Sequence, residues 1–392
     1  YAELIKQYGG VPIVESQYAA NKFIPRSSYD QIVEYIVKEI DDHKGKLAVD
    51  WASFSERNGR FTLGAALAIK ARVLLYAASP LHNPDNDVEK WKKAAAAAYD
   101  IISNPDLNYS LDSDYGAYFQ GNRSLSSPET IYVVRREQSN AMESNNYPIA
   151  TPGGASGVTP TQNLVEAYEW VGDPVAGDPY VNRDPRLAAS VVTNGSTWNG
   201  HVIDQSPGGR HDMSAPNASK TGYYLKKFLT DNLDLTQGAK VQHNWVSYRY
   251  AEVLLNYAEA MNEAYGPDQA PGDYALTALD ALQLVRDRAS LQLPIVTAAT
   301  CDEFREAVKH ERRIELAFED HRYWDLLRWK DAMEVLNKPV RGVKVTKTGE
   351  GKWSYTQTEV ATRTFLERNY YMPFTRSEVE NSNHTLEQNP GY

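Results

Sequence analysis

The sequence predicts a mainly helical fold of stacked helical hairpins, interrupted by a long loop-rich segment. Apolar residues recur with the 3.6-residue period of amphipathic helices in residues 1–104 and again in 246–337. Residues 105–245 lose this period and are rich in Gly, Pro, Asn and Ser, so we expect an irregular, ligand-facing segment with short strands. Residues 338–392 read as a loop followed by an extended closing segment.

The first helical part has the pattern of helical hairpins, of which the first is truncated. Residues 1–8 have the composition of the end of a helix and lead into a Gly/Pro connector. A Ser-x-x-Gln capping box begins an amphipathic helix over 28–43. Residues 61–79 are dense in Ala and Leu and end before a proline. A further helix over 88–103 completes a hairpin with them.

The irregular segment contains only short elements. Residues 130–135 and 221–228 have the β-branched and aromatic content of strands. A short helix is expected over 162–170, after a long Gly/Ser/Pro loop over 139–162. A long loop inside a compact domain is usually functional or mobile.

Helical periodicity returns in the second helical part. Helices are expected over 247–265 and 273–289, followed by a pair over 300–318 and 322–336. Asp320 tolerates a left-handed turn and marks the break between the last two. Hairpins recurring at roughly 35–45 residues suggest tetratricopeptide-like units, although their usual signature is not matched cleanly.

Charged residues interleave with the apolar positions of this last pair. They could form a solvated face with pairs along each helix. We favour instead a structural lattice of ion pairs inside the fold, because buried charges persist only when they are paired and hydrogen-bonded. The residues expected in this lattice are Glu311, Arg312, Arg313, Glu315, Arg322, Asp325 and Arg328.

The amino-acid composition argues against several classes of function. The 392 residues carry a net charge of −10, which argues against nucleic acid or an anionic membrane as the main partner. One cysteine excludes an internal disulfide and a zinc–cysteine cluster. No apolar run approaches the roughly 20 residues of a membrane-spanning helix. Tyr and Trp, at 26 and 8, outnumber the 9 Phe, and both suit contact with a wet, polar ligand.

Aromatic residues outside the helices are the candidate ligand contacts, because a sugar ring packs its C–H face on an aromatic ring. These residues are Trp51, Tyr147, Trp170, Tyr180, Trp198, Trp353 and Tyr355. Residues 139–201 place several of them beside amide and imidazole groups that can bind hydroxyls. We select Tyr147, Trp170, Tyr180, Trp198, Asn199 and His201 as ligand-binding candidates. The alternative for each is packing within a local cluster.

Signatures of catalysis are missing. The segment HERRI at 310–314 lacks the second histidine of a zinc protease, and no nucleophile elbow or P-loop occurs. The acidic loop at 85–87 lacks the spacing of a calcium loop. We therefore expect no metal, no cofactor and no enzyme activity. A helical glycoside hydrolase remains an alternative that needs two carboxylates in an open cleft. The long irregular segment argues against a plain repeat adaptor.

Several motifs resemble the SusD/RagB family, the nutrient-capturing surface lipoproteins of Bacteroidetes. The motifs are ERRIELAFEDHRYWDLLRW at 311–329, GRFTLGAALAIKARVLLYAASPL at 59–81, TGYYLKKF at 221–228 and the tail YYMPFTRSEVENSNHTLEQNPGY. Asp320, Gln283 and Ser290 replace the Gly, Asn and Gly usual in the family. The resemblance covers nearly the whole chain.

The resemblance implies a tetratricopeptide-like frame and a non-catalytic function. It implies capture of an oligosaccharide, or of a peptide as in some relatives, for a SusC-like TonB-dependent transporter. It places the protein on the outward-facing surface of the outer membrane. Membrane attachment is expected only through a lipid anchor in an N-terminal portion that the given sequence lacks. Ligand residues vary within the family, so none is transferred to this chain.

Overall fold

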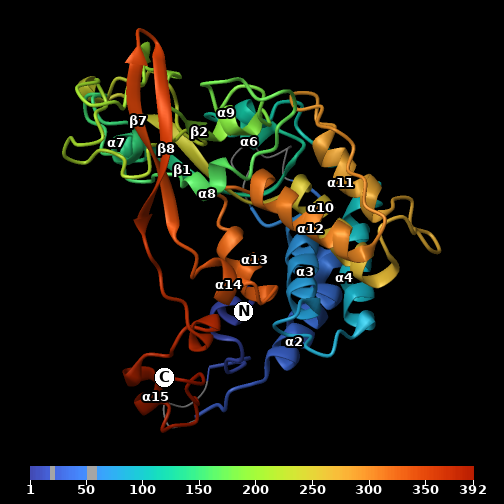
Figure 1. Ribbon diagram of the computed structural model, residues 1–392. Coiled ribbons are helices and arrows are strands. Elements are labelled where there is room, and N and C mark those ends of the chain that lie inside the picture. The colour runs from blue at the N-terminus through green and yellow to red at the C-terminus, as the bar shows by residue number, and fades with distance from the viewer. Residues whose placement is uncertain (18–22, 51–59) are drawn as a thin grey trace.

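The computed structural model describes residues 1–17, 23–50 and 60–392, and the fold in these residues is mainly helical, as predicted. Figure 1 shows a helical body on one side, with the loop-rich segment above it beside a long β-hairpin. The C-terminus lies at the opposite end from the tip of that hairpin. The body contains α2 (Tyr29–His43), α3 (Leu63–Ala78), α4 (Val88–Ile102), α10 (Tyr250–Tyr265), α11 (Ala278–Arg286) and α12 (Cys301–Glu315).

Helix α10 is the centre of this body. Its residues from Ala251 to Asn262 are all buried, as expected for a helix covered on every side. It packs against α3, α4, α11 and α12. Helices α3 and α4 pack against each other and bury alanines of both in one core. Gly64 of α3 lies against Tyr109, which follows α4, and an added Cβ there would meet the tyrosine hydroxyl oxygen at 2.1 Å. The tetratricopeptide-like repeat itself stays a prediction.

The second helix expected after Asp320 is split in two. Asp320 has φ 63°, the left-handed turn that the sequence indicated, and α13 (Arg322–Arg328) follows it. Lys330 then adopts φ 61°, which a helix cannot accommodate, and α14 (Ala332–Val335) begins beyond it. The hydroxyl of Tyr370 donates to the Lys330 carbonyl at 3.1 Å and holds this break.

All strands described lie in antiparallel pairs, and two of these pairs are long. β1 (Thr130–Ser139) pairs with β6 (Val241–Arg249), so the strand predicted over 130–135 is longer than expected. Strand β6 also includes residues 247–249, where a helix was predicted to begin. It therefore crosses the boundary expected at residue 245 between the loop-rich segment and the second helical part. The strand predicted over 221–228 shrinks to β5 (Tyr224–Leu225), paired with β2 (Val191–Val192).

The second long pair lies where a loop was expected. β7 (Val340–Gly349) and β8 (Lys352–Ala361) form the hairpin that rises beside the loop-rich segment in Figure 1. Most of its residues are exposed on both faces, and Val343 and Val345 are among its few buried side chains. Alternation of apolar and exposed polar residues is confined to Val343–Val345 and Trp353–Tyr355, so the sequence pattern gave only a short signal for this hairpin.

The remaining elements are short connectors or lie near the termini. They are α1 (Ala2–Tyr8), η1 (Lys44–Lys46), α5 (Tyr115–Tyr118), α6 (Arg123–Ser126), α7 (Ala141–Asn146), α8 (Gln162–Val165), α9 (Arg186–Ser190), β3 (Thr197–Trp198), β4 (His201–Val202), η3 (Leu235–Gln237), η4 (Glu367–Tyr370) and α15 (Arg376–Asn381). Helix α7 lies within the predicted loop over 139–162, and α8 is shorter than the predicted helix over 162–170.

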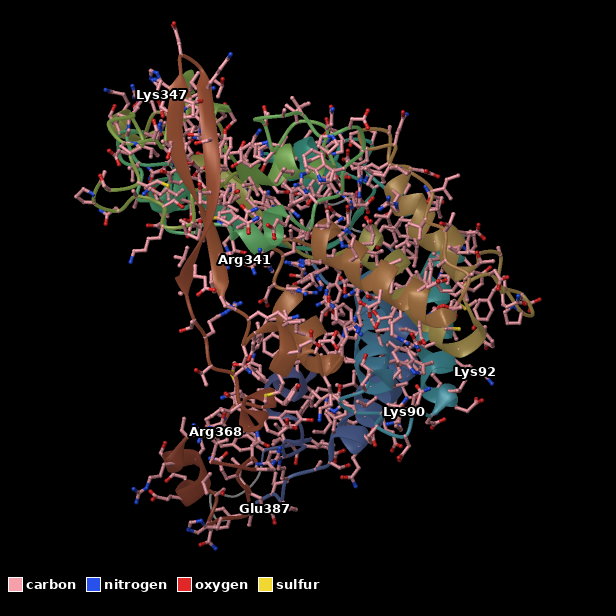
Figure 2. All side chains as sticks on the ribbon, in the orientation of Figure 1. Lys90, Lys92, Arg341, Lys347, Arg368 and Glu387 are labelled. Carbon is pink, nitrogen blue, oxygen red and sulfur yellow. The ribbon has the colours of Figure 1, made fainter. Side chains whose placement is uncertain are left out.

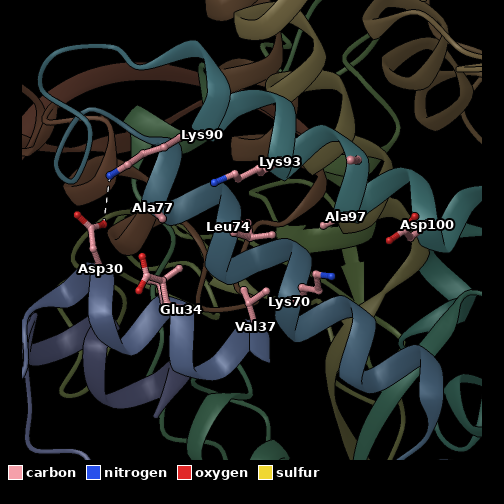
Figure 3. Close-up of a pocket in the computed structure, with 12 residues that line it drawn as sticks. Asp30, Glu34, Val37, Lys70, Leu74, Ala77, Lys90, Lys93, Ala97 and Asp100 are labelled. Atoms are coloured by element: carbon pink, nitrogen blue, oxygen red, sulfur yellow. Dashed lines mark hydrogen bonds and ion pairs between the residues drawn. The ribbon is translucent and has the colours of Figure 1, made fainter. Parts of the chain in front are cut away.

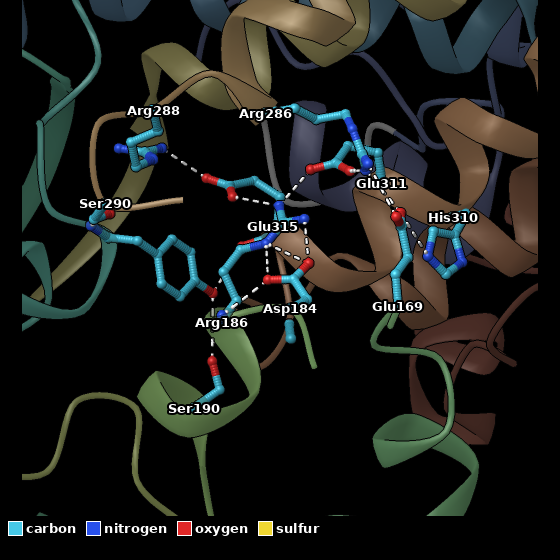
Figure 4. A network of polar contacts seen from close by, with 12 residues as sticks. Glu169, Asp184, Arg186, Ser190, Arg286, Arg288, Ser290, His310, Glu311 and Glu315 are labelled. Atoms are coloured by element: carbon cyan, nitrogen blue, oxygen red, sulfur yellow. Dashed lines mark hydrogen bonds and ion pairs between the residues drawn. The ribbon is translucent and has the colours of Figure 1, made fainter. Parts of the chain in front are cut away.

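A buried network of ion pairs joins the loop-rich segment to the helices (Figure 4). Glu315 of α12 is its centre and is fully buried. Its carboxylate accepts from Arg249 at 2.7 Å, Arg288 at 2.8 Å and Arg186 at 2.9 Å. Arg186 also bonds to Glu311, one turn earlier on α12. Since Arg186 belongs to the loop-rich segment, this network fixes that segment on the helical body.

A second part of the network joins α12 and α13 to α10. Asp325 accepts from Arg312 at 3.0 Å and from Arg328 at 2.9 Å, and all three side chains are buried. Arg328 also donates to Glu259 of α10 at 2.7 Å. Glu311, Arg312, Glu315, Asp325 and Arg328 are thus all placed in buried pairs. Arg313 and Arg322 make no ion pair with a carboxylate of the described residues.

This network predicts a specific loss of stability in acid. Burial would raise the pKa of Glu252, but Arg72 at 2.6 Å outweighs it and the pKa falls to about 2. Glu315 and Asp325 are likewise held well below the usual range by their arginines, despite burial. Because such carboxylates bind protons less readily when folded, their stabilisation is present above the unfolded pKa and lost as pH falls through the folded one.

We therefore expect the free energy of unfolding to fall between about pH 4.5 and pH 2, by on the order of 3 kcal/mol for a carboxylate shifted as far as Glu252. Urea unfolding at a series of pH values measures this. A free energy that is constant from pH 7 to pH 3 would contradict the prediction.

Candidate functional site

A cleft of about 840 Å³ lies between the loop-rich segment and the β7–β8 hairpin. One wall comes from residues 176–183 and 193–196, and the other from residues 348–355 near the tip of the hairpin. Lys347 marks this end of the hairpin in Figure 2, with the side chains of the loop-rich segment beside it. Its lining joins aromatic rings to amide and hydroxyl groups: Tyr180, Asn182, Thr193, Asn194, Ser196, Thr348, Trp353 and Tyr355.

The tyrosines of the cleft are held in a fixed arrangement. Tyr180 meets Tyr355 edge to face, with ring centroids 5.3 Å apart. The hydroxyl of Tyr180 donates to that of Tyr223 at 3.3 Å, and Tyr223 donates to Gln162 of α8. The side-chain amide of Asn194 donates to the Tyr355 hydroxyl at 3.3 Å. These bonds connect the hairpin to the loop-rich wall, so the rings keep their positions without a ligand.

Trp353 is anchored at both its edge and its face. Its indole N–H donates to Asp204 at 3.1 Å, and Asp204 also contacts Lys347 at 3.4 Å. Gly195 approaches the ring so closely that an added Cβ would lie 3.3 Å from a ring carbon, and its φ of +84° already favours glycine. Trp353 and Tyr355 are two residues apart on β8, which places both on one face of the strand.

Arg183 forms a cationic part of the wall. Its guanidinium lies over the ring of Trp170, with 3.9 Å between the guanidinium carbon and the ring centroid. It donates to the carbonyls of Tyr168 at 2.7 Å and Pro179 at 3.1 Å. Burial lowers its pKa. Trp170, which is 37% exposed, therefore supports the wall from behind Arg183 and does not itself line the cleft.

Two of the selected aromatic residues are in a core and offer no ring face to a ligand. Tyr147 and Trp198 are 0% and 2% exposed and pack edge to face with 5.4 Å between centroids. The Tyr147 hydroxyl donates to the Thr230 carbonyl. Their cluster fills the interior of the loop-rich segment with Ile203, Tyr224 and other apolar side chains. Local packing, the alternative weighed for each, is what the structure has at both positions.

Asn199 and His201 lie away from the cleft, at the turn between β3 and β4. Asn199 has φ 46°, and its side-chain oxygen accepts from the Asn232 backbone at 2.7 Å. It lines a separate hollow of about 360 Å³ with residues 232–236. His201 is exposed and lines neither hollow. Of the six selected residues, Tyr180 alone lines the cleft. Trp51, one of the other aromatic candidates, lies outside the described residues.

A hollow of about 470 Å³ between α2, α3 and α4 differs in chemistry from the cleft. Figure 3 shows Val37, Leu74 and Ala77 at its apolar floor, with lysines and carboxylates around them. Lys90 pairs with Asp30 across it at 3.1 Å. None of the described residues that line it has an aromatic or amide side chain, the groups that hold a sugar ring and its hydroxyls.

Acidic groups are sparse in the cleft. Asp178 is the one carboxylate among the described residues that line it, and its oxygen accepts from the backbone of Tyr180 at 3.0 Å. In the part of the chain that the structure describes, no group of three or more His, Cys, Asp or Glu could hold a metal ion. Among the helices of the same residues, none is long and apolar enough to span a bilayer.

Comparison with known proteins agrees on one family. A model of the SusD family matches residues 118–392. Two SusD-like proteins of Formosa agariphila are similar in sequence. One is 24% identical over 378 residues, covering 88% of this chain and 66% of the relative. The other is 23% identical over 406 residues, covering 100% of this chain and 72% of the relative. The chain thus spans about two thirds of the length of these relatives.

Solved structures agree with the sequence comparison. A SusD-like protein from Bacteroides fragilis superposes with a TM-score of 0.82 and 26% identity, covering 100% of this chain and 77% of that one. A SusD-like carbohydrate-binding protein from the same organism superposes with a TM-score of 0.79 and 27% identity, covering 97% of this chain and 76% of that one. Since the family match covers well over half of the sequence and the fold agrees throughout, the chain belongs to the SusD family.

Proposed function

We propose that the protein is a non-catalytic glycan-binding protein that holds an oligosaccharide in the cleft beside the β7–β8 hairpin. The observation that carries this proposal is the joint presence of Tyr180, Trp353 and Tyr355 with amide and hydroxyl groups in one hollow. Aromatic rings offer an apolar face to a sugar, and the surrounding polar groups bind its hydroxyls. The name of one structural relative, a carbohydrate-binding protein, supports the same ligand class.

Binding without reaction is favoured by the charges in the cleft. Hydrolysis of a glycosidic bond generally uses two carboxyl groups about 5–9.5 Å apart. The described lining of the cleft supplies Asp178 alone, and the backbone N–H groups of Tyr180 and Val181 already donate to one of its oxygens. We therefore propose that the ligand leaves unchanged.

Membership of the SusD family supports a proposal for where this binding step takes place. We propose that the protein acts on the outward-facing surface of the outer membrane and passes its glycan to a SusC-like TonB-dependent transporter. An N-terminal lipid would attach the protein to the membrane. Peptide capture, as in some relatives, is the alternative ligand class, and the aromatic and amide lining of the cleft favours a glycan over it.

Isothermal titration of the full-length protein against a panel of neutral oligosaccharides and peptides tests the proposal. We expect at least one oligosaccharide to bind with micromolar to millimolar affinity, or about −8 to −4 kcal/mol, as is typical of an open and hydrated site. Heat from peptides alone would establish the alternative. Release of reducing sugar from a bound oligosaccharide would overturn the non-catalytic assignment.

A further inference from the structure

The polar groups that line the cleft differ in whether the protein itself already bonds to them. The indole N–H of Trp353 and the hydroxyls of Tyr180 and Ser196 donate to other groups of the protein, at 3.1, 3.3 and 2.7 Å. The side chain of Asn194 bonds through both its nitrogen and its oxygen. These bonds hold the two walls in place, so the polar contacts of a ligand depend on the groups that remain.

Arg183 keeps one nitrogen that bonds to none of the described residues. Its Nε donates to the Pro179 carbonyl at 3.1 Å, and its Nη1 donates to the carbonyls of Tyr168 at 2.7 Å and Glu166 at 3.4 Å. No hydrogen bond or ion pair joins Nη2 to a described residue, and Arg183 lines the cleft. Nη2 is not among the buried atoms without a partner, so it is accessible to solvent and hence to a ligand.

The guanidinium group of Arg183 is held in one position. The three carbonyls fix one edge of its plane, and the ring of Trp170 covers one face, with 3.9 Å between the guanidinium carbon and the ring centroid. The backbones of residues 170 and 183 also form an antiparallel bridge beneath the two side chains. A free arginine loses side-chain entropy when it binds a ligand. Here the fold has already ordered the side chain, so Nη2 is a preorganised donor.

Asn182 supplies an acceptor in the same wall. It lines the cleft, and its amide nitrogen donates to the Asp173 carbonyl at 2.8 Å. That bond orients the side chain and leaves its oxygen without a partner among the described residues. A hydroxyl group can both donate and accept a hydrogen bond. A wall that offers one fixed donor and one fixed acceptor therefore suits a ligand rich in hydroxyls.

We propose that Arg183 is a ligand-binding residue that determines which sugar the cleft accepts. Its role rests on the proposed function, because it acts in the same cleft. The rings of Trp353 and Tyr355 offer apolar faces, which sugars can cover in several orientations. Nη2 of Arg183 donates to one oxygen of the stacked sugar and so selects among these orientations. Arginine suits this position because its planar group can bond to the backbone along one edge and to a ligand along another.

Isothermal titration with four neutral probes tests the assignment: cellohexaose, maltohexaose, xylohexaose and mannohexaose. For the probe that the wild type binds most tightly, we expect Arg183→Gln to bind about 10- to 100-fold more weakly, as for one lost hydrogen bond from a charged group. Arg183→Lys should be equally weak, because an ammonium group keeps the charge but lacks the planar arrangement of donors.

The matched control is Arg210→Gln, which removes another arginine of the loop-rich segment. Arg210 is exposed, donates to the Ala150 carbonyl at 3.2 Å and is not among the described residues that line the cleft. It should bind the probe as the wild type does. Equal affinity of Arg183→Gln and the wild type would overturn the assignment and leave the proposed function in place, as would full affinity in Arg183→Lys. If the wild type binds none of the four probes, the proposed function and the assignment fail together.

A crystal structure of the wild type with the same probe separates ligand contact from a structural role. This measurement is needed because Arg183 also bonds to three carbonyls of the wall, and its replacement could weaken binding by disordering them. We expect a sugar oxygen at about 2.7–3.2 Å from Nη2. A probe bound in the cleft with no oxygen within hydrogen-bonding distance of Nη2 would overturn the assignment, whatever the affinities of the variants.

Discussion

Glu315→Gln is expected to destabilise the protein by about 3–5 kcal/mol, the usual effect of removing one partner from a buried ion pair. Glutamine has nearly the same shape but cannot balance the charges of Arg186, Arg249 and Arg288, which all bond to this carboxylate. Because the loop-rich segment is attached through Arg186, we expect the loss to reach the cleft as well. Urea unfolding at neutral pH measures the change in free energy.

The matched control is Glu380→Gln, which removes a carboxylate from an exposed pair. Glu380 contacts Arg376 at 2.7 Å, and their side chains are 52% and 91% exposed. Exposed pairs contribute about 0–1 kcal/mol, so this variant should resemble the wild type. If Glu315→Gln were equally mild, the network would not hold the fold together and the buried charges would need another explanation.

The sequence alone could indicate the charged residues that α12 and α13 contribute to this network, but not their distant partners. On α12 and α13, charged residues alternate with apolar ones, and that pattern is visible without a structure. Their partners Arg186, Arg249 and Arg288 come from segments far away in the chain, and nothing local in their sequence distinguishes them from solvated arginines. The same limit explains Arg313 and Arg322, which share the pattern but make no ion pair with a carboxylate of the described residues.

The candidate cleft was harder to predict than the helices. Trp198 and His201 form a cross-strand pair in a short hairpin of the loop-rich segment, yet the tryptophan is buried and the histidine exposed. Whether an aromatic residue in a loop faces a core or a ligand depends on packing between distant segments, which periodicity does not report. Trp353 and Tyr355 were visible as aromatics outside the helices, but the alternation that places them on one face is too short to have predicted a ten-residue strand.

Trp353→Ala should weaken glycan binding by about 10- to 100-fold, or roughly 1.5–3 kcal/mol, the free energy of burying one large apolar side chain. The ring lies in the cleft wall with its edge fixed by Asp204 and its face against Gly195, so it is already placed for stacking. Isothermal titration with the oligosaccharide that the wild type binds measures the loss. Trp353→Phe should retain most of the affinity, because it keeps a ring and removes only the indole N–H.

Trp245→Ala is the control for this loss, since Trp245 is 38% exposed and does not line the cleft. It should leave affinity unchanged, and both variants should unfold at nearly the temperature of the wild type because neither ring is in a core. Undiminished binding by Trp353→Ala together with a loss in Trp245→Ala would move the sugar site from the β7–β8 hairpin to the β1–β6 pair. A loss in Trp353→Ala that Trp353→Phe does not restore would assign the effect to the indole N–H bond with Asp204, and stacking would then contribute little.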